Sequence, residues 1–170
     1  SGGRIEIRDG EPTGYLEENA FLSFLQKVPM PSTEDLMASY ARAQEAYASY
    51  GITTVQEGML PLPLAPLCRT LMEQKLLWLD VVGYADARET DAVERALPGC
   101  HGVYRNHFKL GGMKIFLDGS PQGRTAWMRA PYEGSENDCG YGTLTDEETE
   151  RFVRLSIQKN VQLLAHCNGD

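Results

Sequence analysis

The sequence lacks several patterns that would assign it at once to a common protein class. It has no run of about 18 apolar residues, so nothing in it predicts a membrane span. No GxGxxG motif opens a helix after a strand, no GxxxxGK(S/T) loop is present, and no GxSxG elbow occurs. These absences disfavour a dinucleotide-binding fold, a phosphate-binding loop and a serine hydrolase.

Basic residues are in deficit as well. The chain carries 16 lysines and arginines against 24 aspartates and glutamates, which gives a formal net charge of -8. Nucleic acids and anionic membranes are bound through basic surfaces that displace counterions, so neither is an expected partner. Small molecules or other proteins are expected instead. The 170 residues, 42% hydrophobic and 24% charged, suit one compact globular domain.

Cysteine is present, but not at a spacing that is typical of metal binding. The four cysteines are widely and irregularly spaced, and no CxxC or CxxxxC pair occurs, so a structural zinc knuckle is not expected. The start of the chain, residues 1–5, shows no charged-then-apolar signal organisation. We therefore expect reduced thiols and a cytoplasmic protein. The cysteines are Cys68, Cys100, Cys139 and Cys167.

Strand and helix patterns alternate along the chain. A β-hairpin is predicted first, because Ile5 and Ile7 alternate with charged residues and Asp9-Gly10 is a favoured turn. Helix patterns then separate four apolar strands. Such alternation is typical of parallel β/α units, so the sequence predicts an α/β fold, either a doubly wound sheet or part of an eight-stranded barrel. The strands are expected at 52–55, 76–84, 113–117 and 161–165.

The helices have recognisable starts, stops and apolar faces. Ser32 with Asp35 resembles a capping box, and Gly51 supplies the stop of that helix. Thr145 with Glu148 predicts the start of the last helix. A further polar helix is expected at 88–97. The apolar helix faces are predicted from Leu67, Leu71 and Met72, and from Phe152, Val153, Leu155 and Ile157.

Lys114 is a charged residue inside the apolar strand MKIFL. A buried ammonium without a partner is costly, so Lys114 either pairs with Asp118, two pleats along, or reaches the strand end. A sharper hypothesis is that burial lowers its pKa, so that the amine reacts with CO2. The resulting carbamate could bridge two metal ions. A third possibility is an isomerase or aldolase in which Lys114 forms a Schiff base.

His166 ends the expected strand VQLLAH. In β/α folds, catalytic groups collect at the carboxyl ends of strands. A single histidine there can be a hydrogen-bonded structural residue, but Asn168-Gly169-Asp170 makes the strand end polar and favours a ligand. Cys167 points to the other face of the strand, so it does not easily reach the same ion. His101 and His107 have no histidine partner at a metal-binding spacing, and we expect them at the surface.

A long loop, residues 119–142, follows the Lys114 strand. Connections of this length without structure of their own often cover an active site or bind a ligand, although a plain surface excursion is the alternative. Its Arg124, Trp127, Arg129 and Tyr132 are candidates for substrate contact.

Five separated motifs resemble one family. RDGEPTGYLEENA, YGITTVQEG, MKIFLDGS, TAWMRAPY and LLAHCNGD occur in the order seen in family-3 amidohydrolases of the N-substituted-formamide-deformylase-like type. The resemblance covers essentially the whole chain. It implies an eight-stranded TIM barrel, of which residues 1–170 would be an incomplete domain carrying about strands 2–5. GITTV and LLWLDVVGY would be the second and third strands.

The resemblance also implies a site and a reaction. Lys114, at the position where the superfamily often carries a carbamylated lysine, and His166 would be metal ligands. The metal would be one or two divalent ions, usually zinc. Glu17, Arg124 and Tyr132 are plausible contacts for a small amide-type substrate. The implied activity is metal-dependent hydrolysis of non-peptide C–N bonds such as amides and formamides.

Parts of the family pattern are missing or changed. The first-strand HxH pair, the sixth-strand histidine and the eighth-strand aspartate are absent, and HCNGD stands where HAIGD-like forms are common. We therefore expect no complete catalytic set in this chain, weak or no metal binding, no activity of the piece alone, and self-association through open sheet edges. A non-catalytic binding or regulatory protein with a degenerate barrel is the alternative function.

Overall fold

The computed structural model describes residues 4–25, 27–29 and 31–170, so the first three residues of the chain lie outside the described part. The chain divides into two compact units. We name them the hairpin unit (Ser1–Met30, Phe116–Thr145 and His166–Asp170) and the sheet unit (Pro31–Ile115 and Asp146–Ala165).

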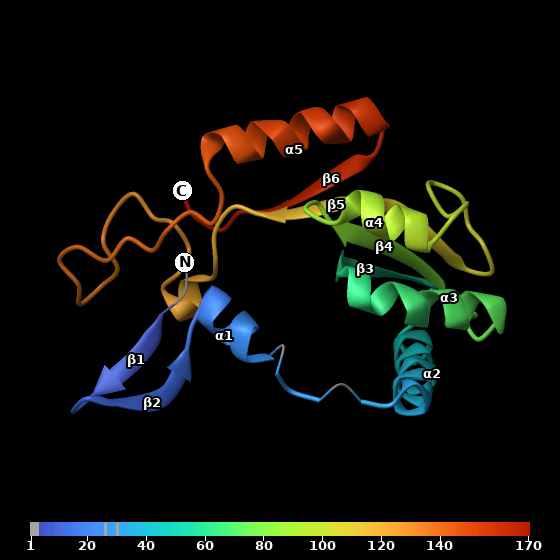
Figure 1. The fold of residues 1–170 in the computed structure, drawn as a ribbon, viewed down its shortest axis with the longest axis horizontal. Coiled ribbons are helices and arrows are strands. Elements are labelled where there is room, and N and C mark those ends of the chain that lie inside the picture. Colours follow the sequence, from blue (N-terminus) through green and yellow to red (C-terminus); the bar gives the residue numbers. More distant parts are fainter. Residues whose placement is uncertain (1–3, 26, 30) are drawn as a thin grey trace. The chain divides into compact units, whose positions relative to one another are not determined.

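A four-stranded sheet is the centre of the sheet unit (Figure 1). Its strands lie in the order β3-β4-β5-β6, and β3 and β5 both pair with β4 in parallel. Gly112 lies against Gln162, and Leu117 N donates to His166 O, so β6 also runs parallel to β5. The predicted α/β fold with four parallel strands is confirmed. The strands are β3 (Thr54–Leu60), β4 (Asp80–Asp86), β5 (Phe108–Phe116) and β6 (Gln162–His166).

Two strands begin later than the sequence predicted. The apolar run 76–84 enters the sheet only at Asp80, and the run 52–55 only at Thr54. Thr54 and Asp80 are the first paired residues of β3 and β4, so both strands start where a neighbour becomes available for ladder hydrogen bonds. Apolar content alone does not mark that point: Trp78, inside the predicted strand, is 50% exposed.

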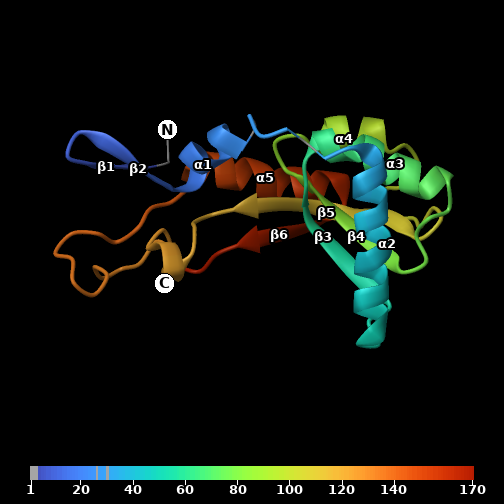
Figure 2. The same cartoon turned by 90° about the horizontal axis from the view of Figure 1, so that it is seen from below.

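The helices follow one another beside the sheet (Figure 2). Helix α3 packs against both α2 and α4. Lys159 of α5 forms ion pairs of 2.8 Å with Asp91 and Glu94 of α4, which places α5 next to α4. These helices are α2 (Thr33–Ser49), α3 (Ala65–Glu73), α4 (Thr90–Ala96) and α5 (Asp146–Lys159), and a 3-10 turn, η1 (Leu62–Leu64), precedes α3.

One apolar cluster joins the helices to the sheet. Leu67 and Leu71 of α3 and Val93 of α4 are buried together with Val81 and Ala85 of β4. Burying such side chains contributes roughly 1.5–3 kcal/mol each. This part of the core therefore confirms the apolar face predicted for α3. Strand β4 is buried along nearly its whole length, as expected of a strand covered on both faces.

The apolar face predicted for α5 is wrong at two positions. Phe152 is buried as expected, but Val153 is 40% and Ile157 is 72% exposed. The residue that shares the inward face with Phe152 is Ser156, one helical turn later. Val153 and Ile157 each follow an inward residue by one position, and a step of one residue turns about 100° around the helix.

The start and stop predicted for α2 are confirmed. Asp35 N donates to Ser32 Oγ at 3.1 Å, and Ser32 Oγ donates to the Asp35 carboxylate at 2.6 Å. The helix ends before Gly51, which has the positive φ of 76° that lets the chain turn out of a helix.

The predicted hairpin is confirmed in the hairpin unit. Strand β1 (Ile5–Arg8) pairs antiparallel with β2 (Glu11–Leu16). Asp9 and Gly10 both have positive φ, 53° and 84°, which is the backbone of a two-residue hairpin turn that favours Asp-Gly. Helix α1 (Glu18–Leu25) follows, and the loop after β5 holds one 3-10 turn, η2 (Pro121–Gly123), among its described residues.

The remaining expectations concern histidines, cysteines and membranes. His101 and His107 are exposed, as predicted, and contact Glu94 and Asp80. All four cysteines are free of disulfides, and Cys167 is the exposed one. Within the described ranges, no helix combines the length and the apolar character needed to cross a bilayer.

Substitution of Gln44 tests whether its side chain holds the backbone of residues 76–79, directly before β4. Gln44 is 4% exposed; its Oε1 accepts from Trp78 N and Leu79 N, and its Nε2 donates to Leu76 O. Gln44→Ala leaves buried backbone groups without partners, so it should lower the free energy of unfolding by about 3 kcal/mol. Chemical denaturation measures this.

Gln158→Ala on α5 is the matched control, because Gln158 is exposed. Its free energy of unfolding should change by less than about 0.5 kcal/mol. Equal stabilities of the two variants would contradict the role assigned to Gln44.

Candidate functional site

A buried carboxylate stands just beyond the carboxyl end of β5. Asp118 is 3% exposed and accepts three backbone hydrogen bonds. Asn168 N donates to Oδ1 at 2.9 Å, whereas Trp127 N and Gly169 N donate to Oδ2 at 3.0 and 2.6 Å. The donors come from the long loop and from the segment after β6. Asp118 therefore fastens two chain segments to the end of its own strand.

These contacts set the charge state of Asp118. Burial by itself would raise the pKa of the carboxyl, but the hydrogen bonds from Asn168, Trp127 and Gly169 and the nearby His166 outweigh it and leave the pKa below its ordinary value. The side chain is thus an ionised hydrogen-bond acceptor near neutral pH. Because both oxygens already accept from N–H groups, Asp118 is suited to holding the backbone rather than to exchanging a proton.

His166, the last residue of β6, is oriented by the backbone of the same cluster. Its Nε2 lies 2.8 Å from Gly119 O. A carbonyl oxygen only accepts, so a hydrogen bond to Gly119 O requires the hydrogen on Nε2, whereas a bond from Asn168 Nδ2 to the same nitrogen, 2.9 Å away, requires the other tautomer. The ring also lies 5.3 Å from the Phe116 ring, at a tilt of 48°. With the hydrogen on Nε2, the lone pair of the ring is on Nδ1.

Asn168 shares the acceptor that orients His166. Its Nδ2 donates to Gly119 O at 2.9 Å and lies 2.9 Å from His166 Nε2. Two donors thus converge on one carbonyl. The backbone and side chain of Asn168 bind the neighbours Asp118 and Gly119, so the turn after β6 is anchored twice.

Gly169 completes the cluster because no larger residue fits there. A Cβ at this position would lie 1.9 Å from Trp127 O and 2.9 Å from Asp118 Oδ2. Real Cβ atoms do not approach backbone oxygens so closely, so a side chain at 169 would push the loop away from Asp118.

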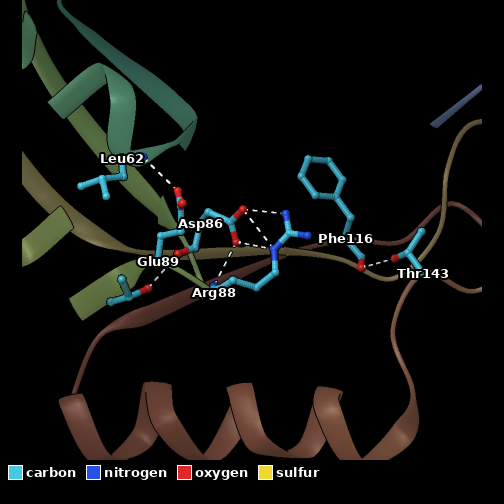
Figure 3. A network of polar contacts seen from close by, with 7 residues as sticks. Leu62, Asp86, Arg88, Glu89, Phe116 and Thr143 are labelled. Atoms are coloured by element: carbon cyan, nitrogen blue, oxygen red, sulfur yellow. Dashed lines mark hydrogen bonds and ion pairs between the residues drawn. The ribbon is translucent and has the colours of Figure 1, made fainter. Parts of the chain in front are cut away.

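Lys114 is placed by the register of β5 in the sheet unit. It pairs with Asp86 of β4, so it shares the sheet face of Asp86 and Tyr84 rather than that of the Val81 and Ala85 cluster. Asp86 is buried and already paired with Arg88, whose Nη2 lies 2.6 Å from Asp86 Oδ2 (Figure 3). The carbamate hypothesis and the metal-ligand role for Lys114 stay predictions.

Two of the three predicted substrate contacts line one pocket of the hairpin unit. Glu17 and Arg124 face a pocket of about 730 Å³. Tyr132 does not line it, but its ring lies 6.0 Å from the Arg124 guanidinium and its hydroxyl donates to Ala126 O at 2.7 Å. Tyr132 therefore lies beside Arg124 but outside the pocket lining. The lining residues are Arg4, Tyr15, Glu17, Gln122, Gly123, Arg124, Asp138 and Tyr141.

The donors in the described part of the chain do not form a metal site by themselves. No three histidine, cysteine, aspartate or glutamate side chains among those residues could hold one ion together. Asp118 accepts three N–H bonds, so both of its oxygens are already occupied.

The sequence predicted His166 as a metal ligand, which stays a prediction, and did not predict which groups hold its ring. Asp118 was considered only as a partner of Lys114, and Asn168 and Gly169 only as a polar strand end. The signal was nonetheless present: a polar DG directly follows one expected strand and HCNGD ends the next. Carboxyl ends of neighbouring parallel strands meet at one sheet edge, so these two segments should have been placed together.

Asp118→Asn tests whether the carboxylate holds the two chain segments in place. An amide nitrogen facing N–H donors cannot accept, so the variant should lose about 2–4 kcal/mol of the free energy of unfolding at pH 7. Because folding lowers the pKa of Asp118, its contribution is complete above the unfolded-state pKa of about 3.9 and is lost as the pH falls through the folded-state pKa. Denaturation from pH 7 to pH 2 measures both effects.

Asp146→Asn serves as the control, since Asp146 is an exposed aspartate in the first turn of α5. This substitution should lower the free energy of unfolding by less than about 1 kcal/mol. The difference in the free energy of unfolding between Asp118→Asn and the original protein should become smaller below about pH 4. If this difference in the free energy of unfolding stays constant with pH, the charge of Asp118 does not hold the two segments.

Comparison with known proteins covers the whole chain. The model of a family described as the amidohydrolase family, Amidohydro_3, matches residues 1–170. YtcJ of Bacillus subtilis (strain 168), a candidate amidohydrolase, is 34% identical over 64 residues, which are 38% of this chain and 12% of YtcJ. LONG AFTER FAR-RED 3 of Arabidopsis thaliana is 25% identical over 189 aligned residues, with 99% of this chain and 31% of that protein covered.

Two solved structures share the fold. An uncharacterized metal-dependent hydrolase from Pyrococcus horikoshii OT3 superposes with a TM-score of 0.78 at 22% identity, covering 98% of this chain and 35% of that one. One from Pyrococcus furiosus gives 0.75 at 21% identity, covering 91% and 33%. The chain thus spans about a third of the solved proteins it matches. With the family model matched from its first residue to its last, the chain belongs to the amidohydrolase family.

Proposed function

We propose that this protein works as a metal-dependent hydrolase of non-peptide C–N bonds, of the amide or formamide type. The observation that carries the proposal is the state of His166. This histidine ends a parallel strand and its Nε2 lies 2.8 Å from Gly119 O; we assign the hydrogen to Nε2, which leaves the lone pair on Nδ1. A ring fixed through one nitrogen so that the other is free is the usual arrangement of a metal-ligating histidine.

The metal proposed is a divalent ion, zinc by the family resemblance. His166 through Nδ1 and Lys114 as a carbamate are the proposed ligands from this chain. Such an ion, when bound, lowers the pKa of a coordinated water to about 7 and polarises the carbonyl of the scissile bond. The further ligands that a zinc site requires would have to come from outside the described cluster.

The residues around His166 have positioning roles. Asp118 holds the backbone at Asn168 and Gly169, and this fixes the chain directly after His166. Gly119 O fixes the tautomer of the ring. Asp118 is not proposed as the aspartate that takes and returns the proton, because protonation would weaken three hydrogen bonds that hold the cluster.

The 170 residues alone are proposed to bind metal weakly and to be inactive, since two ligands do not make a site of useful affinity. Strands β3 and β6 are the edge strands of the described sheet, and open edges favour self-association. Sedimentation of the 170-residue chain measures the latter: a single monomeric species would contradict it.

His166→Asn tests the proposed function. The variant and the unaltered protein are expressed with all the sequence that the gene encodes on either side, and zinc content and hydrolysis of an N-substituted formamide are measured. Loss of a metal ligand should reduce both, with kcat/KM lower by about 100-fold or more.

His101→Asn is the matched control, because His101 is an exposed histidine on a different element. It should keep both metal and activity. Full zinc content and unchanged hydrolysis in His166→Asn would contradict the proposal. An unaltered protein with neither zinc nor hydrolysis would favour the alternative, a non-catalytic binding or regulatory protein.

A further inference from the structure

The segment after β6 contains a pair of residues that is chemically labile in a free peptide. Asn168 is the only asparagine of the sequence that is followed by glycine. We propose that Asn168 is a modification site, at which the side-chain amide converts to a carboxylate, and that contacts with Asp118 suppress this reaction while the chain is folded. The reaction needs neither a metal nor a substrate, and it is independent of the proposed function.

The reaction is an attack by the backbone nitrogen of Gly169 on Cγ of Asn168. A bond forms between these two atoms, the bond from Cγ to Nδ2 breaks, and Nδ2 leaves as ammonia with the hydrogen that Gly169 N has lost. Water then opens the cyclic imide at either carbonyl, which gives aspartate or isoaspartate at position 168. Glycine favours the attack because it has no side chain to hinder the approach.

In the folded chain, the hydrogen that this attack must remove is bound to a carboxylate. Gly169 N donates it to Asp118 Oδ2 at 2.6 Å, and Asn168 N donates to Oδ1 of the same carboxylate at 2.9 Å. Asp118 is 3% exposed, so these charge-assisted bonds are shielded from water. Removing the hydrogen as a proton would also create a negative charge on the nitrogen beside an existing one, which is unfavourable.

The two reaction partners are confined by other contacts as well. A Cβ at Gly169 would lie 1.9 Å from Trp127 O, so the backbone of the long loop lies directly against this residue. Asn168 Nδ2 donates to Gly119 O at 2.9 Å. The cyclic imide can therefore form only after the segment has left Asp118 and the loop, that is, from a locally open state.

The protection does not come from burial of the amide itself. The Asn168 side chain belongs to an exposed residue, so water reaches it in the folded chain. The rate of conversion should then equal the rate in the open chain multiplied by the fraction of time that the segment is open. Conversion of Asn168 thus measures how often the contacts with Asp118 are lost.

Conversion would weaken the contacts that suppress it. A carboxylate has only acceptor oxygens, so at position 168 it could not donate to Gly119 O as the amide does. Isoaspartate would in addition insert a methylene group between the two N–H groups that now bind Asp118. Modified molecules should therefore have a loosened chain after β6, next to His166.

The test is an incubation of the 170-residue chain at mildly alkaline pH, folded in buffer and unfolded in guanidinium chloride. Mass spectrometry of proteolytic peptides measures the conversion of Asn168, and chromatography separates the aspartate from the isoaspartate product. Asn168 should convert about tenfold or more slowly in the folded chain than in the unfolded one.

Asp118→Asn separates the effect of the carboxylate from that of folding in general. In this variant Asn168 should convert about tenfold faster than in the folded original chain, because the open segment is more populated. Asp146→Asn, which removes an exposed carboxylate from α5, is the matched control and should keep the original rate. Circular dichroism in the same buffer shows whether each variant is folded.

Hydrogen exchange at Gly169 N–H is the second measurement, and it decides if Asp118→Asn does not fold. In the original chain this exchange should be slower by about tenfold or more than in guanidinium chloride, since the same opening exposes the N–H group.

Asn168→Asp tests the consequence of the modification. It should raise the equilibrium constant of unfolding about tenfold, whereas Asn137→Asp, at an exposed asparagine of the long loop, should leave this constant nearly unchanged.

Equal rates of conversion in the folded and the unfolded chain would overturn the proposal, as would no conversion in guanidinium chloride. So would a folded Asp118→Asn that converts no faster than the original chain. A slower reaction in that variant would show that the carboxylate acts as a base and promotes the attack. Exchange of Gly169 N–H as fast as in the unfolded chain, or equal acceleration in Asp146→Asn, would likewise contradict the role of Asp118.

Discussion

The arrangement of the candidate site depends on one buried charge, the carboxylate of Asp118. Three backbone N–H groups from two distant segments point at it, and no side chain of comparable charge shares the task in the described cluster. Hydrogen bonds to an ionised acceptor are stronger than those between neutral groups, and in a buried setting their loss is costly. The position of the chain after β6, and with it the setting of His166, follows from this electrostatic constraint.

A second constraint is steric and acts on the same atoms. Gly169 allows the backbone after β6 to lie against Trp127 O, so that its N–H reaches Asp118 at 2.6 Å. The Asp118 carboxylate attracts the N–H groups, and the missing side chain of Gly169 lets the backbone come close enough to donate. Together with the Gly119 carbonyl, which lies 2.8 Å from His166 Nε2, they hold the end of β6 in one arrangement.

Much of this fold could be predicted from local sequence. The Asp9-Gly10 turn, the Ser32 capping box and the Gly51 stop each depend on residues close together in the chain, and each was confirmed. Strand starts were less predictable, because Thr54 and Asp80 begin their strands by pairing with each other. The exposed Val153 and Ile157 show a similar limit: apolar character does not say which side of α5 faces the sheet. The Asp118 cluster depends on the pairing of β5 with β6: the polar DG and HCNGD strand ends indicated which segments meet, but not which N–H groups reach Asp118.

The central claim is that His166 carries its hydrogen on Nε2 and offers Nδ1 to a metal. Long-range proton–nitrogen NMR of the 170-residue chain, labelled with ¹⁵N-histidine at neutral pH, measures this directly, and Asn168→Ala or His166→Asn assigns the signals. A neutral ring protonated at Nε2, with its Nδ1 resonance shifted by added Zn²⁺, is the expected result. A ring protonated at Nδ1, with zinc leaving that nitrogen unperturbed, would contradict the claim.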